Sequence, residues 1–260
     1  MYEYLLFEVD EHKIGTLTIN KERALNTLSL ETITELKQFT DNELISSGLK
    51  VLIVTGAGRK AFVAGADIGQ MREMTKKEFE NYCNIGHSAF NALQKAPFPV
   101  IAAINGYALG GGCELSVACD IRIASENAKI GFPETKLGLF PCWGGSQRVT
   151  RLMGIGKAKE LIFTGEMISA EEALQIGLVD KVVKQEILIE ETSKIARQIA
   201  GNSPLAVGYA KNVINTGSEM DLPEALSYEL ENGLNCFDSE DRKEGMSAFL
   251  EKRTANFKGN

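Results

Sequence analysis

Residues 105–114 of this chain read NGYALGGGCE, and this stretch decides the interpretation of the fold. It follows the apolar run of residues 100–104, which is typical of a strand buried on both faces. Three consecutive glycines lose more backbone entropy on folding than alanines would. They therefore indicate a close backbone approach, an unusual turn or free amides at a helix N-terminus. Glu114 could simply stabilise the dipole of that helix, but this interpretation leaves the glycines unexplained.

Two further segments are rich in small residues and could lie beside Glu114. Residues 60–68, KAFVAGADI, follow a second buried run at residues 51–54. Backbone amides at such a strand-to-helix turn can point at a developing oxyanion. Residues 131–148 contain prolines, glycines and a single acidic residue, Glu134. Taken alone, the segments are also explained by a tight loop and a solvated glutamate, and Trp143 by ordinary core packing.

The rest of the chain predicts an α/β protein with a helical C-terminal part. Strands are predicted from alternating or continuous apolar runs, and helices from helical spacing and two capping boxes. Strand-like runs disappear after about residue 185, which places a boundary near residues 195–205. The predicted strands are 3–9, 13–20, 51–54, 100–104 and 121–123, and the predicted helices are 29–45, 75–93, 115–119 and others beginning at 143 and 169.

Composition limits the classes of partner and site. A net charge of -7 gives no general attraction to nucleic acid or anionic lipid. Five cysteines without a CxxC pair indicate reduced thiols, and two distant histidines leave little material for a zinc site or a Ser-His-Asp triad. The N-terminus alternates like a strand rather than a signal peptide, and no stretch is long enough to span a bilayer. We therefore expect a cytoplasmic protein with no nucleic-acid or membrane partner.

Two other kinds of site fit the glycines less well. Residues 54–58, VTGAG, follow a strand but do not complete the GxGxxG fingerprint of a dinucleotide site. Cys113 at a helix N-terminus could be an activated thiolate. No general base other than the glutamates accompanies it, so a small buried thiol is the simpler interpretation.

Together the three segments resemble the crotonase (enoyl-CoA hydratase/isomerase) family. The motifs that carry the resemblance are AGAD at 64–67, NGYALGGGCEL at 105–115 and PETKLGLFPCWGGSQ at 133–147. The likeness extends from NKERALN at 20–26 to MSAFLEKR at 246–253. It implies an α/β fold, a crotonase-type spiral of ββα units. Residues 1–200 would form the acyl-CoA-binding, catalytic core, and residues 201–260 a C-terminal helical oligomerisation region of a homotrimer or dimer of trimers.

The resemblance also implies the chemistry. The ligand would be an acyl-CoA thioester whose carbonyl oxygen lies between the backbone amides of Ala66 and Gly111. Hydratases of the family keep two glutamates, and these match Glu114 and Glu134. The implied reaction is hydration of a short- or medium-chain trans-2-enoyl-CoA to the 3-hydroxyacyl-CoA. Glu114 would orient the water as base and Glu134 would donate the proton to C2, with no metal and no cofactor beyond the CoA of the substrate.

Further substrate contacts follow from the same match. The chain departs from the family pattern at Cys142, where glycine is common, at Glu22, where proline is common, and at Gly69, where some short-chain hydratases have lysine. Cys142 could narrow the acyl end of the pocket. Arg23, Lys60 and Lys258 are candidates for the CoA phosphates. The full set of predicted substrate-binding residues is Arg23, Ala24, Leu25, Lys60, Ala64, Asp67, Ile68, Gly110, Pro133, Cys142 and Lys258.

Other activities within this resemblance stay open. An enoyl-CoA isomerase needs only one acid/base group, and a branched, glutaconyl-type hydratase would use the same pair. The thioester could be carried by CoA or by a carrier protein. A non-catalytic or RNA-binding member is disfavoured by the acidic net charge and by the intact pair of glutamates.

Overall fold

An antiparallel hairpin begins the larger of two sheets in the computed structural model, which describes residues 2–260. The strands that follow it add in parallel, and all residues of β3 and β5 are buried, which explains their continuous apolar runs. The six-stranded sheet has the order β1 (Leu5–Val9), β2 (Ile14–Ile19), β3 (Val51–Gly56), β5 (Val100–Ile104), β7 (Ile121–Ser125) and β10 (Lys181–Val183).

A smaller, four-stranded sheet contains the strands that directly follow β3, β5 and β7 along the chain. Its order is β4 (Ala61–Val63), β6 (Tyr107–Leu109), β8 (Lys129–Gly131) and β9 (Met167–Ser169). The chain therefore passes from β3 to β4, from β5 to β6 and from β7 to β8, and each pair is followed by helical turns. This repeat of strand, strand and helix brings the ends of β4, β6 and β8 together, where the small-residue segments lie.

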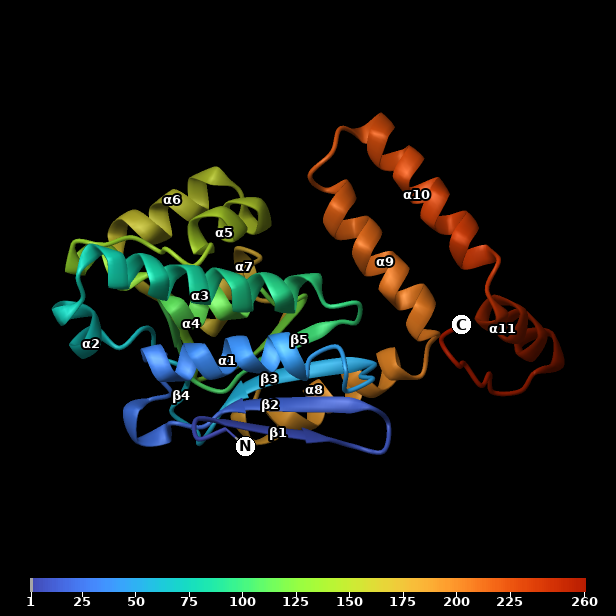
Figure 1. Cartoon of the computed structure of the whole chain (residues 1–260), viewed down its shortest axis with the longest axis horizontal. Coiled ribbons are helices and arrows are strands. Elements are labelled where there is room, and N and C mark those ends of the chain that lie inside the picture. Colours follow the sequence, from blue (N-terminus) through green and yellow to red (C-terminus); the bar gives the residue numbers. More distant parts are fainter. Residues whose placement is uncertain (1) are drawn as a thin grey trace.

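Two helical layers bury the faces of the six-stranded sheet (Figure 1). α1 (Leu30–Asn42) packs on α3 (Lys76–Lys95) over one face, and α8 (Leu188–Ala200) covers the other. Ser29 caps α1, and Thr75 with Glu78 forms the predicted capping box of α3. The described residues include no helix that is both long and apolar enough to cross a membrane.

The sequence predictions of the hairpin, of the buried strands and of the long helices are confirmed. The short helix predicted at 115–119 instead begins at Gly111, because the glycines themselves form its first turn. The other short helices are α2 (Ile68–Glu73), α4 (Gly111–Val117), α5 (Gly145–Met153), α6 (Ile155–Thr164) and α7 (Ala170–Gln175), with 3-10 turns η1 (Glu22–Ala24), η2 (Pro133–Leu137) and η3 (Gln185–Ile187).

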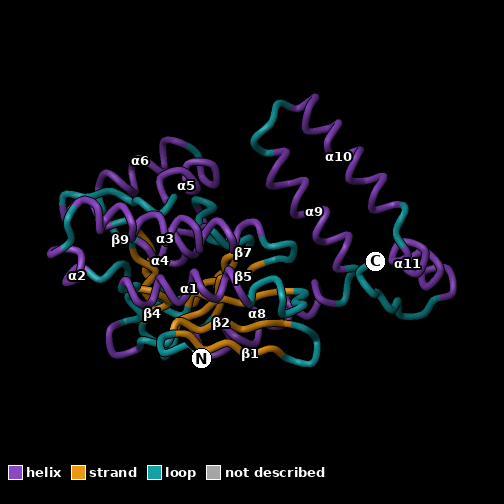
Figure 2. Tube along the Cα trace, viewed as in Figure 1, coloured by secondary structure: helices purple, strands orange, loops and turns teal. Residues whose placement is uncertain are grey.

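Three C-terminal helices form an arm that stands away from the sheets, as Figures 1 and 2 show. They are α9 (Pro204–Gly217), α10 (Leu222–Phe237) and α11 (Glu240–Glu251). Lys211 of α9 joins the arm to the body through an ion pair with Asp120 at 2.7 Å and a hydrogen bond to the Phe98 carbonyl at 2.9 Å. Much of α10 remains exposed, including the leucines Leu222, Leu226, Leu230 and Leu234.

Candidate active site

The triple glycine fastens the first turn of α4 to the ends of the small sheet. Gly110 has a φ of 50°, a conformation that favours glycine, and its amide donates to the Gly131 carbonyl of β8 at 2.9 Å. A Cβ on Gly112 would lie 1.9 Å from the Val63 carbonyl oxygen of β4, so no larger residue fits there. Glu114 in this turn is consequently carried inward and is 2% exposed.

The Glu114 carboxylate is held by backbone donors from the turn before α5. Its Oε1 accepts the amide of Trp143 at 2.7 Å and the amide of Gly145 at 2.8 Å. Hydrogen bonds of this kind favour the ionised form of a carboxyl group. They also fix one oxygen, so the group is oriented before any ligand arrives.

Glu134 lies at the start of η2, and its environment differs from that of Glu114. Its Oε2 is buried and has no hydrogen-bond partner among the described residues. A Cβ on Gly110 would lie only 3.0 Å from Oε1 of Glu134, so this glutamate sits against the N-terminus of α4. An unpartnered buried carboxyl oxygen is costly unless it is protonated or contacts a ligand.

Burial raises the pKa of both glutamates to about 7. The charge of Glu134 raises the pKa of Glu114 further, whereas the amides of Gly145 and Trp143 act in the opposite direction. For Glu134 only its own amide opposes the effect of burial on the pKa. At neutral pH the two groups can therefore hold one proton between them, the condition under which a pair works as acid and base.

Two amide donors lie beside these carboxyl groups. Ala66 forms a parallel bridge with Leu28, yet neither the Ala66 amide nor the Gly111 amide donates to an acceptor of the described residues. A Cβ on Gly111 would lie 3.7 Å from the Ala66 nitrogen, so the two loops meet at this point. Free amides that converge in this way can stabilise an oxyanion.

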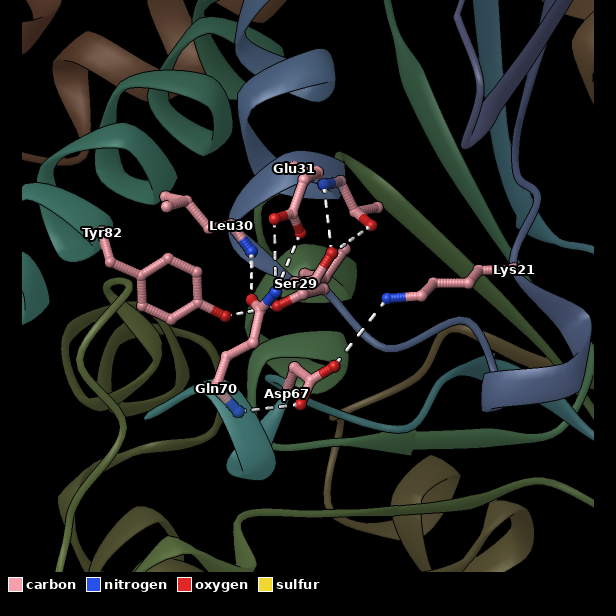
Figure 3. A network of polar contacts seen from close by, with 9 residues as sticks. Lys21, Ser29, Leu30, Glu31, Asp67, Gln70 and Tyr82 are labelled. Carbon is pink, nitrogen blue, oxygen red and sulfur yellow. Dashed lines mark hydrogen bonds and ion pairs between the residues drawn. The ribbon is translucent and has the colours of Figure 1, made fainter. Parts of the chain in front are cut away.

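A polar network holds the loop that carries Ala66 (Figure 3). The Asp67 carboxylate caps α2 by accepting the Gln70 amide at 3.1 Å. Oε1 of Gln70 accepts the Leu30 amide at 2.9 Å, and its Nε2 donates to Glu31 at 3.0 Å. The Tyr82 hydroxyl donates to the carbonyl of Leu28, the residue that bridges Ala66. The loop is thus fixed to the start of α1.

A pocket with about 680 Å³ of empty space, part of it open to solvent, connects these features. Both glutamates line it. Seven other predicted site residues also line this pocket, namely Ala64, Ala66, Ile68, Gly110, Gly111, Pro133 and Cys142. The structure thereby brings together residues from three segments that are distant in the sequence.

Other predicted contacts do not line this pocket. Residues 23–25 form η1 and its end, where the Leu25 carbonyl accepts the Ala64 amide at 3.0 Å and so braces the loop from outside. The Lys60 side chain is exposed. Asp67 faces Lys21 at 3.8 Å, so its position in this structure is that of a helix cap instead of a pocket residue.

Lys258 lies at the end of the arm, where its amide donates to Asp241 at 2.8 Å. The arm stands away from the sheets (Figure 1), and Lys258 is not among the residues that line the pocket around Glu114 and Glu134. Its predicted contact with the CoA phosphates stays a prediction.

Several pocket residues were missed from the sequence. α2 and α3 contribute apolar side chains, and Trp143, interpreted as ordinary core, is buried but also lines the pocket. Apolar residues at helical spacing give the same signal whether they face a core or a ligand, so no pattern distinguished them. The missed residues include Met71, Phe79, Tyr82, Cys83, Leu137, Leu139, Phe140 and Trp143.

The described residues contain no group of three or more His, Cys, Asp or Glu side chains placed to hold a metal ion. All five cysteines are free thiols, in agreement with the prediction. Burial raises the pKa of Cys113 well above its usual range, which keeps the thiol protonated and weakens it as a nucleophile.

The chain is similar to known proteins along nearly its whole length. The family profile described as Enoyl-CoA hydratase/isomerase matches residues 10–260. A short-chain-enoyl-CoA hydratase of Clostridium acetobutylicum is 47% identical, with 94% of this chain and 93% of that protein covered. A crotonyl-CoA hydratase of Syntrophomonas wolfei is 45% identical, with 98% of each chain covered.

The crystal structure of an enoyl-CoA hydratase from Bacillus anthracis matches with a TM-score of 0.96 at 42% identity, covering 99% of this chain and 100% of that one. This match confirms the predicted crotonase-type α/β fold of repeated ββα units. The resemblance inferred from the three motifs is confirmed by the profile and by the relatives. The chain belongs to the enoyl-CoA hydratase/isomerase family.

Proposed function

We propose that this protein hydrates short- and medium-chain trans-2-enoyl-CoA thioesters to 3-hydroxyacyl-CoA. The observation that carries the proposal is the pair of the buried Glu114 and the half-buried Glu134, two carboxyl groups with a pKa of about 7 that line one pocket beside two free amides. The names of the relatives from Clostridium acetobutylicum and Syntrophomonas wolfei, a short-chain-enoyl-CoA hydratase and a crotonyl-CoA hydratase, agree with it.

The amides of Ala66 and Gly111 would receive the thioester oxygen. As water adds to C3, negative charge moves onto this oxygen and an enolate-like thioester develops. The amides stabilise that charge without reorganising, because the network around Gln70 and the first turn of α4 already hold them in place.

The surroundings of the two carboxyl groups support a division of roles. Glu114 accepts two backbone amides, which favours its anion, so it orients the water and takes a proton as that water attacks C3. Glu134 has an oxygen without a donor, which favours its neutral form, so it gives a proton to C2. One proton is taken and one is given, and the pair is restored by exchange with solvent.

This reaction transfers no electrons, and CoA is part of the substrate. We propose on that ground that it requires no metal and no separate cofactor. Activity should be unchanged after dialysis against a chelator, and a loss that added metal restores would contradict this part of the proposal.

The decisive experiment follows the loss of enoyl-thioester ultraviolet absorbance with crotonyl-CoA. We expect rapid loss with the wild type and a fall of about 10³-fold or more in Glu114→Gln and in Glu134→Gln. No loss with crotonyl-CoA or with longer and branched enoyl-CoAs would overturn hydration. Migration of a 3,4 double bond that survives Glu114→Gln would instead indicate the isomerase alternative, which needs a single acid/base group. Parallel assays with a carrier-protein thioester identify the preferred carrier.

We also propose that residues 201–260 join copies of this chain into a trimer or a dimer of trimers. The exposed leucines of α10 support this, because a monomer seldom leaves so continuous an apolar stripe in water. Light scattering should give a mass of three or six chains. Leu230→Glu with Leu234→Glu should reduce it, and a monomeric wild type would refute the assembly.

A further inference from the structure

The indole of Trp143 fills the space between α3 and the first turn of α4. A Cβ on Gly86 of α3 would lie 2.4 Å from the indole nitrogen, and a Cβ on Gly111 would lie 2.5 Å from Cζ3. The ring therefore rests directly on the backbone of both helices. Each glycine leaves room that any side chain would take away, and the Trp143 side chain is 3% exposed.

Aromatic contacts and the backbone fix the ring in this position. Tyr82 meets it edge to face with centroids 4.8 Å apart, and Phe90 does so at 5.7 Å. Nη1 of Arg148 donates to the Trp143 carbonyl at 3.0 Å. Rotation of the ring out of the pocket would break this packing, so the ring acts as a rigid wall.

This wall stands next to the reacting atoms. The Trp143 amide donates to Oε1 of Glu114 at 2.7 Å, so the side chain leaves the backbone at the carboxylate that would activate water at C3. The ring also covers Gly111, whose amide would hold the thioester oxygen. Cys83 and Cys142 line the same pocket. Acyl carbons beyond C3 of a substrate held by these groups would lie along the indole.

We propose that Trp143 determines acyl-chain length, by closing the acyl end of the pocket so that crotonyl thioesters are accepted and progressively longer enoyl thioesters, up to and beyond decenoyl, are disfavoured. The inference rests on the proposed hydration and narrows its substrate class. One methylene that a rigid apolar pocket cannot accommodate changes kcat/KM by roughly 10- to 200-fold. Selectivity against long chains should therefore be steep.

The test compares kcat/KM for crotonyl-, hexenoyl-, octenoyl- and decenoyl-CoA. In Trp143→Leu the ratio of decenoyl to crotonyl activity should rise at least about tenfold over the wild type, with Trp143→Phe between the two. Phe39→Leu is the matched control, because Phe39 is a buried aromatic residue whose ring contacts Tyr2 and Phe7, and it does not line the pocket. It should lower stability while the ratio stays constant.

A binding measurement separates this inference from the proposed reaction. Saturated butyryl- to decanoyl-CoA are titrated into wild type, Trp143→Phe and Trp143→Leu by calorimetry. If the variants bind the longer saturated acyl-CoAs more tightly than the wild type does, Trp143 limits acyl-chain length, even if no enoyl-CoA is hydrated. Equal length dependence in all three proteins, in binding and in turnover, would overturn it while leaving hydration intact. The two conservative variants avoid dependence on Trp143→Ala, whose cavity could prevent folding.

Discussion

The Gly145 amide donates to Oε1 of Glu114 at 2.8 Å, and a Cβ on Gly145 would lie 2.7 Å from Cγ of the same glutamate. Gly145 thus supports the carboxylate with its amide and, by lacking a side chain, leaves room for the glutamate stem. The orientation of the proposed base therefore depends on a backbone turn that lies 31 residues further along the chain.

Gly145→Ala should lower kcat while leaving KM for crotonyl-CoA nearly unchanged. The added methyl displaces Glu114 but does not touch the amides of Ala66 and Gly111, and a displacement of this size costs about 100-fold in rate. Steady-state kinetics measure the effect. Gly156→Ala is the control, because no atom lies within 4 Å of its added methyl and helical Gly→Ala changes are neutral or stabilising. Equal kcat in both variants would show that the Glu114 contact is unimportant.

The rate of hydration should depend on pH as a bell with its maximum near pH 7. The proposed mechanism needs one ionised and one protonated carboxyl group, and both glutamates have a pKa of about 7. Acid should protonate Glu114, and alkali should remove the proton from Glu134. Because the two carboxyl groups interact, the acid and alkaline sides of the pH profile give apparent pKa values of the pair and not of either glutamate alone. Initial rates of crotonyl-CoA hydration between about pH 5 and pH 9 test this, and a flat profile would contradict it.

Glu134→Gln should stabilise the protein at alkaline pH. Burial raises the pKa of Glu134 from 4.5 to about 7 in the folded state. The contribution of the neutral Glu134 carboxyl group to the stability of the folded protein is therefore fully present below pH 4.5 and is lost as pH rises through about 7. A glutamine is neutral throughout, so the variant should gain about 1–3 kcal/mol over wild type at pH 8 and little at pH 5.

Urea unfolding at the two pH values measures this difference. Glu80→Gln, on the exposed face of α3, serves as control and should show no such gain. A gain of the same size at both pH values would mean that packing, and not ionisation, distinguishes Glu134→Gln from the wild type.

Much of the fold could be predicted because its signals are local. The apolar runs at 51–54 and 100–104 mark strands that are buried on both faces, and Thr75 with Glu78 marks the start of α3. The glycines at 110–112 correctly indicated a close approach, although the partner backbone at Val63 and Gly131 lies far away in the sequence. Such partners are set by strand order, which a single sequence does not specify.

Site residues that a motif identifies by residue type were predicted from the sequence. Site residues that reach the pocket because of the orientation of their side chains were missed. Motifs located Glu114, Glu134 and the two amides. Trp143 was interpreted as core, which its burial confirms, but the sequence could not indicate that its ring also faces the ligand pocket. Lys258 was assigned by its charge; in the structure its amide donates to Asp241 of the arm and it does not line the pocket, so its contact with substrate stays a prediction.

Gln70→Ala should reduce kcat about tenfold by loosening the loop that carries Ala66. The change removes the acceptor of the Leu30 amide and the donor to Glu31. The Gln70 hydrogen bond is the largest cause that lowers the pKa of Glu31, so that pKa should rise in the variant. NMR titration of Glu31 and kinetics report the two effects. Arg72→Ala, on the same helix with an exposed partner, should change neither. An unchanged kcat in Gln70→Ala would show that α1 does not position the loop.

Lys211→Met should detach the arm from the body. Burial raises the pKa of Asp120, and the Lys211 charge at 2.7 Å is the main opposing influence. Removing one partner of a buried pair leaves an uncompensated charge and costs about 3–5 kcal/mol. Asp120→Asn combined with Lys211→Met removes both charges, so the double variant should recover most of the lost unfolding free energy. The difference between the double variant and the sum of the two single variants is the coupling energy of a double-mutant cycle. Chemical unfolding measures these energies, and limited proteolysis after Ala200 measures release of the arm.

The control for this last change is Lys194→Met, which removes a cation that lies 4.0 Å from Glu191 on the exposed side of α8. Exposed pairs contribute about 0–1 kcal/mol, so this variant should stay close to wild type. If Lys211→Met were equally harmless, the arm would be held by apolar packing alone. If the double variant were no more stable than Lys211→Met, the loss would come from the lysine stem and its bond to the Phe98 carbonyl, because the charge of Asp120 would then contribute nothing.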